Sequence, residues 1–298
     1  MNLLICIALT SSFYLIFKVF DRLKIETYQA VVINYFVCVV TGVVFVPKSD
    51  IPMLWHEYAS SLPYGVVLGC LFMTAFYMMA RAAQDLSVAI STVSSKMSMV
   101  VPALYSLLVV HTGAYDWLNY FGMVLAILAI WFTANVKKSS LSVVSSKNSL
   151  LLVVGIFILT GIVDTLLTVV NRLYEDVRFQ ELFPIVCFAC ATFLGGIVLI
   201  YRFWNGTSSF AWKNVFGGML LGVPNYFSIY FLFRALKDFN HNGALVYPVL
   251  NISIIVLSTG LSVLFFKDRL SRTTLVGILF AVVAIVLLSH VELVRLFD

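Results

Sequence analysis

Charged residues are scarce in this chain. Only 11% of its 298 residues are Asp, Glu, Lys or Arg, whereas 61% are hydrophobic. A soluble globular domain carries about 25% charged residues, so this composition excludes a domain surrounded by water on all sides. Most of the excess positive charge lies in short segments between apolar blocks. There it orients a chain in a bilayer, and it does not favour nucleic-acid binding.

Long polar stretches and catalytic motifs are lacking as well. The longest polar stretch, "NVKKSSLSVVSSKN" at 135–148, is too short to fold as a domain. The sequence has no Gly-rich phosphate loop, nucleophile elbow or HExxH motif, and its four histidines show no metal-ligand spacing. The five cysteines, including Cys187 and Cys190, all lie in apolar blocks, where a reactive thiolate is disfavoured. We therefore expect no enzyme activity, no metal site and no cofactor.

What the chain does have is a series of apolar blocks, each long enough to cross a bilayer as a helix of roughly 20 residues. A lipid-exposed backbone must satisfy its own hydrogen bonds, which favours helices here. The first block begins at Met1 and is expected to be retained as a helix. The ten blocks cover residues 1–19, 27–47, 62–82, 86–110, 117–136, 149–170, 179–201, 213–235, 241–266 and 273–291. The sequence thus predicts an all-α membrane protein with ten transmembrane helices.

The two halves of the chain resemble each other. Residues 64–85 align without a gap on residues 217–238, and this register matches Gly65, Gly69, Arg81 and Asp85 to Gly218, Gly222, Arg234 and Asp238. Because each half has five crossings, an odd number, the second copy must enter the membrane inverted. We therefore predict two inverted five-helix repeats, at 1–136 and 149–298, joined by a basic linker at 137–148.

This pattern resembles the drug/metabolite transporter superfamily, and within it the EamA-type transporters. The best-matching part is 244–288, where Pro248 and the corner "FFKDRLS" resemble the family's helix-nine proline and the corner that follows it. The corner departs from the family in having Phe266, Lys267 and Asp268 in place of Gly-Glu. The resemblance implies a transporter with a central cavity between helices one, three, four, six, eight and nine. It also implies that both termini lie in the cytoplasm.

Two charged residues lie deep inside apolar blocks. Lys96 lies about ten residues into the fourth block, in "STVSSKMSMV", and Asp164, in the sixth block, is the only acid deep inside any of the ten blocks. A charge at the centre of a membrane helix costs roughly 2.5–3.5 kcal/mol on insertion scales, and such residues usually face a cavity or a partner. We expect Lys96 to bind an anionic group of a substrate. Asp164 is expected to bind the substrate's ammonium, carry a coupling proton or neutralise Lys96.

Other polar residues follow the same helices at helical spacing. The fourth helix has a stripe of Ser and Thr residues that is suited to lining a wet cleft, and the sixth has a stripe that runs through Asp164. A kink is expected in the eighth helix at "GVP". The further candidates for substrate contact are Tyr14, Thr92, Ser95, Thr160, Asn225, Tyr247 and Asn251.

Structural alternatives accompany each of these predictions. Lys96 and Asp164 could form a buried ion pair that only fixes helix packing. Arg81 and Arg234 precede Asp85 and Asp238 by four residues, which favours a local salt bridge at the membrane edge over a gating role. The Gly-x3-Gly pairs favour close packing of helices three and eight within one chain, with dimerisation as the alternative.

The sequence therefore predicts a multi-pass secondary transporter of a small polar metabolite, resembling an amino acid or another zwitterion or anion, in a bacterial inner membrane. It would work as an exporter or exchanger by alternating access, as a monomer or a homodimer. The alternative is a membrane-embedded lipid-modifying enzyme or a lipid flippase. The distribution of Lys and Arg places both termini outside, against the resemblance, so orientation stays open.

Overall fold

The computed structural model describes residues 1–46, 59–105, 107–108, 116–134, 146–174, 177–239, 243–268 and 270–290. These residues are almost entirely helical and include no strand. Most of the linker at 137–148 and three of the four histidines, His56, His111 and His241, lie outside this part. The helices are α1 (Asn2–Arg22), α2 (Thr27–Phe45), α4 (Leu62–Asp85), α5 (Val88–Lys96), α6 (Val100–Tyr105), α7 (Trp117–Ala134), α8 (Ser146–Leu173), α9 (Val177–Trp204), α10 (Trp212–Asp238), α11 (Gly243–Phe266) and α12 (Arg272–Leu288). Two 3₁₀ turns, η1 (Ala59–Ser61) and η2 (Met97–Met99), precede α4 and separate α5 from α6.

The helices have the length and composition of membrane spans. Eight stretches of helix in the described residues are long and apolar enough to cross a bilayer, counting 88–105 as one span, and α7 and α12 are shorter apolar helices. Many large apolar side chains are exposed on the outside of the bundle, such as Phe193 at 69% and Leu264 at 70%. Exposed apolar side chains of this kind are favourable against the hydrocarbon of a bilayer and unfavourable in water. The chain is accordingly a multi-pass membrane protein.

The fourth span is broken, contrary to the continuous helix predicted over 86–110. The 3₁₀ turn η2 interrupts it directly after Lys96. Pro102 lacks the N–H that would bond to the carbonyl of Ser98. Ser94 and Ser98 bond back to the carbonyls of Ile90 and Ser95, at 2.7 and 2.6 Å, which competes with regular helix geometry.

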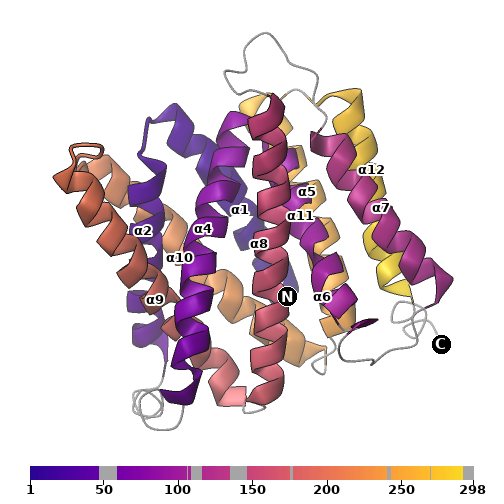
Figure 1. Cartoon of the computed structure of the whole chain (residues 1–298), viewed down its shortest axis with the longest axis horizontal. Coiled ribbons are helices and arrows are strands. Elements are labelled where there is room, and N and C mark those ends of the chain that lie inside the picture. The colour runs from indigo at the N-terminus through magenta and orange to yellow at the C-terminus, as the bar shows by residue number, and fades with distance from the viewer. Residues whose placement is uncertain are drawn as a thin grey trace.

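Successive spans run alternately up and down in one bundle, with α5, η2 and α6 forming a single span (Figure 1). We call the end where α1 begins and α12 ends the terminal end, and the opposite end, where α7 ends and α8 begins, the linker end. At one edge α7 packs along α12; elsewhere α2 packs on α10 and α4 on α9. α1 packs on α10 and α11, and α8 packs on α4, α5 and α6.

Glycines allow these pairs to approach closely. A Cβ on Gly69 would lie 2.7 Å from the backbone nitrogen of Ala191 in α9, and one on Gly222 would lie 2.7 Å from the carbonyl oxygen of Asn34 in α2. On α12, a Cβ on Gly277 would lie 2.9 Å from the carbonyl oxygen of Ala129 in α7. Helices three and eight (α4 and α10) therefore pack closely within one chain, but on α9 and α2 respectively and not on each other.

Candidate functional site

Lys96 is the last residue of α5, and its side chain is half-buried. Its ammonium makes no hydrogen bond and no ion pair with any residue that the structure describes. The side chains of Asp164 in α8 and Cys6 in α1 are close enough to act on it electrostatically. The negative end of the α5 helix dipole also lies beside it. Lys96 is thus a cation within a membrane span. Nearby negative charge stabilises it, but no residue in the described part of the chain bonds to it directly.

Asp164 lies in the second half of α8, and its side chain is exposed. Its Oδ2 accepts a hydrogen bond from Oγ of Ser98, at 3.1 Å, in η2. The Lys96 ammonium and the Asp164 carboxylate form no ion pair at 4.0 Å or less in the described residues, so the two charges interact at longer range. The alternative of a buried ion pair that only fixes helix packing is therefore wrong for the described structure.

Two residues of α11 approach the same point. Tyr247 is 43% exposed although it lies within a span, and it is within electrostatic reach of Asp164. The amide nitrogen of Asn251 lies 3.9 Å from Sδ of Met99 in η2. We call Lys96, Ser98, Asp164 and Tyr247 the central cluster. It joins three spans, α5–η2, α8 and α11, around one charge of each sign.

The Ser and Thr stripe of the fourth span does not line a wet cleft, which corrects the sequence prediction. Thr92 is fully buried and bonds to the carbonyl of Val88 and to Ser258, while Ser95 is 6% exposed and bonds to the carbonyl of Thr92. Tyr14 is also fully buried, with its hydroxyl 2.7 Å from Oγ of Ser95. These hydroxyl groups satisfy backbone carbonyls and one another, because a membrane interior offers them no water.

Thr160 and Asn225 likewise have local roles. The hydroxyl of Thr160 donates to the carbonyl of Ile156, one turn earlier in α8, at 2.6 Å. The Asn225 amide is buried and donates to Asn34 in α2 at 3.1 Å, so it fixes the α2–α10 contact at a distance from Lys96. Sequence spacing could show that Asn225 lay inside a helix but not which neighbour that face would meet.

The charged residues at the ends of helices three and eight differ between the halves. Arg81 and Asp85 form the predicted salt bridge, at 2.8 Å. In the second half, the guanidinium of Arg234 lies over the ring of Tyr230, 4.6 Å from its centroid, and Asp238 accepts a hydrogen bond from Asn2 at 2.9 Å. The local salt bridge expected there is therefore wrong for the described structure. Asp238 instead ties α10 to the start of α1.

At the linker end, contacts that the sequence did not suggest join α1 to the end of α11. Lys18 and Asp268 form an ion pair at 3.1 Å between α1 and the end of α11, and both side chains are mostly buried. Arg22 lies over the ring of Phe266. The partners of the ion pair are 250 positions apart and belong to different halves, so no local pattern points to them.

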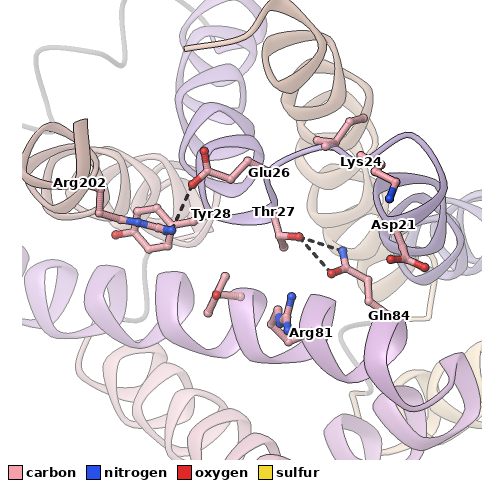
Figure 2. Close-up of a pocket in the computed structure, with 10 residues that line it drawn as sticks. Asp21, Lys24, Glu26, Thr27, Tyr28, Arg81, Gln84 and Arg202 are labelled. Atoms are coloured by element: carbon pink, nitrogen blue, oxygen red, sulfur yellow. Dashed lines mark hydrogen bonds and ion pairs between the residues drawn. The ribbon is translucent and has the colours of Figure 1, made fainter. Parts of the chain in front are cut away.

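A charged pocket of about 300 Å³ opens at the same end, between the α1–α2 corner and the ends of α4 and α9. Figure 2 shows Arg81 rising between Arg202, Glu26 and Tyr28 on one side and Gln84, Asp21 and Lys24 on the other. Arg202 pairs with Glu26 at 3.2 Å and lies over the Tyr28 ring. Gln84 and Thr27 bond to each other at 2.9 Å. We call this the interfacial pocket.

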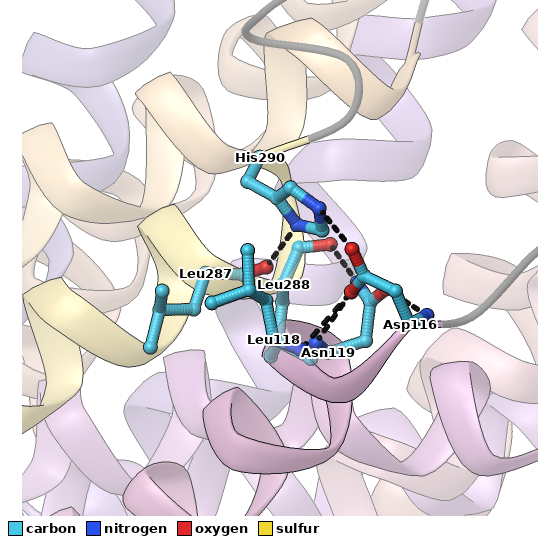
Figure 3. Close-up of polar contacts among 6 residues, drawn as sticks. All are labelled: Asp116, Leu118, Asn119, Leu287, Leu288 and His290. Atoms are coloured by element: carbon cyan, nitrogen blue, oxygen red, sulfur yellow. Dashed lines mark hydrogen bonds and ion pairs between the residues drawn. The ribbon is translucent and has the colours of Figure 1, made fainter.

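Polar contacts also join α7 and α12 at the terminal end (Figure 3). Oδ1 of Asp116 accepts from the backbone N–H groups of Leu118 and Asn119, and so caps α7. His290 lies with Nε2 2.8 Å from Oδ2 of Asp116 and Nδ1 2.8 Å from the carbonyl oxygen of Leu287. The His290 ring thus links the start of α7 to the last turn of α12.

The Asp116 carboxylate should make the α7–α12 contact pH-dependent. Desolvation acts to raise its pKa, but bonds from the Asn119 backbone, His290 and the Leu118 backbone together lower the pKa below the ordinary value. Its contribution is therefore present above about pH 3.9 and is lost as the pH falls through the lowered pKa. We expect Asp116→Asn, which keeps a capping oxygen, to lower the melting temperature by about 2 °C at pH 7. Melting curves of the purified protein from pH 7 to pH 3 check this, with Asp238→Asn as control. A difference that stays constant down to pH 3 would contradict it.

Among the described residues, no group of three His, Cys, Asp or Glu side chains gathers that could hold a metal ion. The central cluster instead offers an ammonium, a carboxylate, a hydroxyl and a phenol. Such a set can bind a small molecule that carries charges of both signs, because each charge finds its opposite within a low-dielectric region.

Comparisons with known proteins show a shared architecture. No protein-family model matches the chain. An uncharacterized protein of Haemophilus influenzae is 27% identical over 300 residues, which cover 98% of each chain. A protein solved by crystallography matches 100% of this chain and 97% of its own, with a TM-score of 0.59 and 13% identity. At that identity the match shows a common fold and says nothing of function.

Proposed function

We propose that this protein is a secondary transporter of a small zwitterionic or anionic metabolite, of the EamA type within the drug/metabolite transporter superfamily. The observation that carries the proposal is Lys96: an ammonium within a membrane span, partly accessible and without a direct protein partner in the described residues. Membrane proteins retain such costly charges mainly at substrate and ion pathways. We further propose that it works as an exporter or exchanger in a bacterial inner membrane.

An inverted repeat is part of this proposal, and the helix contacts support it. Exchanging the two halves pairs α1 with α8, α2 with α9, α4 with α10, α5 with α11 and α7 with α12. Under that exchange the contact of α2 with α10 becomes that of α9 with α4, and both pairs occur. The contact of α1 with α10 likewise becomes that of α8 with α4. The close-packing glycines obey the same exchange, since Gly69 faces α9 and Gly222 faces α2.

The broken fourth span supports a binding site at this point. Transporters commonly place substrates at interrupted helices, where freed backbone groups and helix ends meet the ligand. Here the break at η2 lies between Lys96 and Pro102, and Ser98 within it already bonds to Asp164. We propose that the carboxylate or other anionic group of the substrate binds Lys96 and that its ammonium binds Asp164.

One departure from symmetry indicates where a substrate would enter. In the first half α1 packs on α4 and α5, whereas in the second half α8 has no comparable contact with α10 or α11 in the described residues. The linker end is held by the Lys18–Asp268 ion pair. These two observations favour access to the central cluster between α8 and α11, with the linker end closed. Alternating access would then require the Lys18–Asp268 pair to open.

Reconstitution tests the proposal against the lipid-directed alternatives. Protein in liposomes should take up labelled amino acids, first selected by a thermal-shift screen over amino acids, nucleosides, sugars and amines. The same vesicles should not scramble fluorescent phospholipids faster than empty ones. Lipid scrambling without solute uptake would instead assign the protein as a flippase, and turnover of a lipid would assign it as an enzyme.

The role of Asp164 can be tested by removing the ammonium from the substrate. We expect Asp164→Asn to reduce uptake of the zwitterion about tenfold, the loss of one charge-assisted contact, and to affect the deaminated analogue much less. Uptake of both compounds is measured with purified variants, and Asp238→Asn, at the end of α10, serves as the control. Equal losses for both compounds would show that Asp164 does not contact the ammonium.

A further inference from the structure

The interfacial pocket holds charges that other side chains leave available. Glu26 and Arg202 neutralise each other at 3.2 Å, and Arg81 is held from one side by Asp85 at 2.8 Å. Asp21 and Lys24, by contrast, form no ion pair with any residue in the described part of the chain. The pocket therefore offers a free carboxylate, a free ammonium and the remaining N–H donors of Arg81.

The pocket lies at the height of lipid head groups. Large aromatic side chains are exposed around the end of α9 and the start of α10, next to Arg202: Tyr201 at 64%, Trp204 at 87% and Trp212 at 69%. Tyr and Trp concentrate in membrane proteins at the boundary between hydrocarbon and water. Below them on α9, Ile197 and Phe193 are exposed and apolar, as in a surface that faces acyl chains.

We propose that the interfacial pocket binds a zwitterionic phosphate ester, the phosphoethanolamine head group. The phosphate would bind to Lys24 and to the free donors of Arg81, and the primary ammonium would donate to Asp21. A purely anionic head group would leave the Asp21 carboxylate without a positive partner. A choline group carries a positive charge but has no N–H to donate to that carboxylate. The volume of about 300 Å³ is at the small end of ligand sites and suits a head group. This inference requires only that the chain spans a membrane, and it stands apart from the transport proposal.

Native mass spectrometry of the delipidated protein in mild detergent tests this. Phosphatidylethanolamine, phosphatidylcholine and phosphatidylglycerol are titrated separately onto the wild type, Lys24→Gln, Asp21→Asn and Lys213→Gln. Lys24 and Asp21 are exposed and unpaired, so their variants should fold, which melting curves without lipid check. Lys213 is exposed at the same end but outside the pocket, and is the matched control.

We expect phosphatidylethanolamine to bind most tightly, and each pocket variant to weaken it about tenfold, the effect of one charge-assisted hydrogen bond, with Lys213→Gln unchanged. Equal binding of the three lipids, or an equal loss in Lys213→Gln, would overturn the proposal. Free O-phosphoethanolamine is added as a competitor to identify the source of the ligand. Displacement of the lipid at equal concentration assigns the pocket to a soluble phosphate ester of the same chemistry, and failure to displace assigns it to the lipid.

Discussion

Replacing Lys96 by Met should weaken substrate binding about 100-fold while leaving the melting temperature unchanged or higher. Loss of a hydrogen bond to a charged group costs about 1.5–3 kcal/mol, which is 10- to 150-fold in affinity. Met preserves the volume and removes a charge whose burial in a membrane costs roughly 2.5–3.5 kcal/mol. Binding is measured by isothermal titration and stability by melting of the same purified sample.

The opposite signs of the two effects separate a binding role from a packing role. If Lys96 served only to hold α5 and α8 together, Lys96→Met would lower the melting temperature, because Asp164 would lose its neutralising charge. Lys237→Met, at the exposed end of α10, controls for loss of a positive charge. Full binding by Lys96→Met would contradict the proposed function directly.

Gly222→Leu should lower the melting temperature by about 5 °C or more, or prevent assembly. A Cβ at this position would lie 2.7 Å from the carbonyl oxygen of Asn34 and 2.7 Å from Cβ of Val37. Overpacking costs typically about 1–3 kcal/mol, and the nearest atom here belongs to backbone that cannot rotate away. Thermal unfolding followed by tryptophan fluorescence gives the measurement, and detergent gel filtration reports assembly.

A second pair of variants makes this result specific. Gly69→Leu should behave in the same way, because its Cβ would lie 2.7 Å from the backbone of Ala191. Gly260→Leu should change little, since nothing lies within 4 Å of a Cβ there. If all three variants had the same lowered melting temperature, the effect would come from the added leucine itself and not from the tight helix contacts.

The apolar blocks of the sequence predicted most of the helices within a few residues. The block at 62–82 corresponds to α4 (Leu62–Asp85), and that at 149–170 to α8 (Ser146–Leu173). Block length is a direct consequence of bilayer thickness, which explains this agreement. The break at η2 was not predicted, because the sequence reads the same whether a serine hydroxyl bonds to nearby backbone or faces water.

The site was predicted less completely than the fold. Asp164 lies within electrostatic reach of Lys96 and of Tyr247, and the two charged residues could be singled out because an isolated charge in an apolar block is a strong signal. The substrate contacts predicted for Tyr14, Ser95 and Asn225 are not supported, because these buried side chains bond to other parts of the protein. Helical spacing shows which face of a helix carries a residue, but not which helix packs against that face. The pairs Lys18–Asp268 and Glu26–Arg202 depend on which helices become neighbours, and no periodicity in one segment contains that information.

The fourth span also bears on how the protein is made. It is the least apolar of the eight long spans and the one with the largest share buried inside the protein. A segment with Lys96 and several hydroxyl groups is poorly suited to pass by itself from the translocation machinery into the lipid bilayer. Its neighbours α1, α8 and α11, which supply Tyr14, Asp164 and Ser258, provide the surroundings that it needs. Since two of these three are synthesised later, we expect the insertion of this segment to be completed only once the second half of the chain is present.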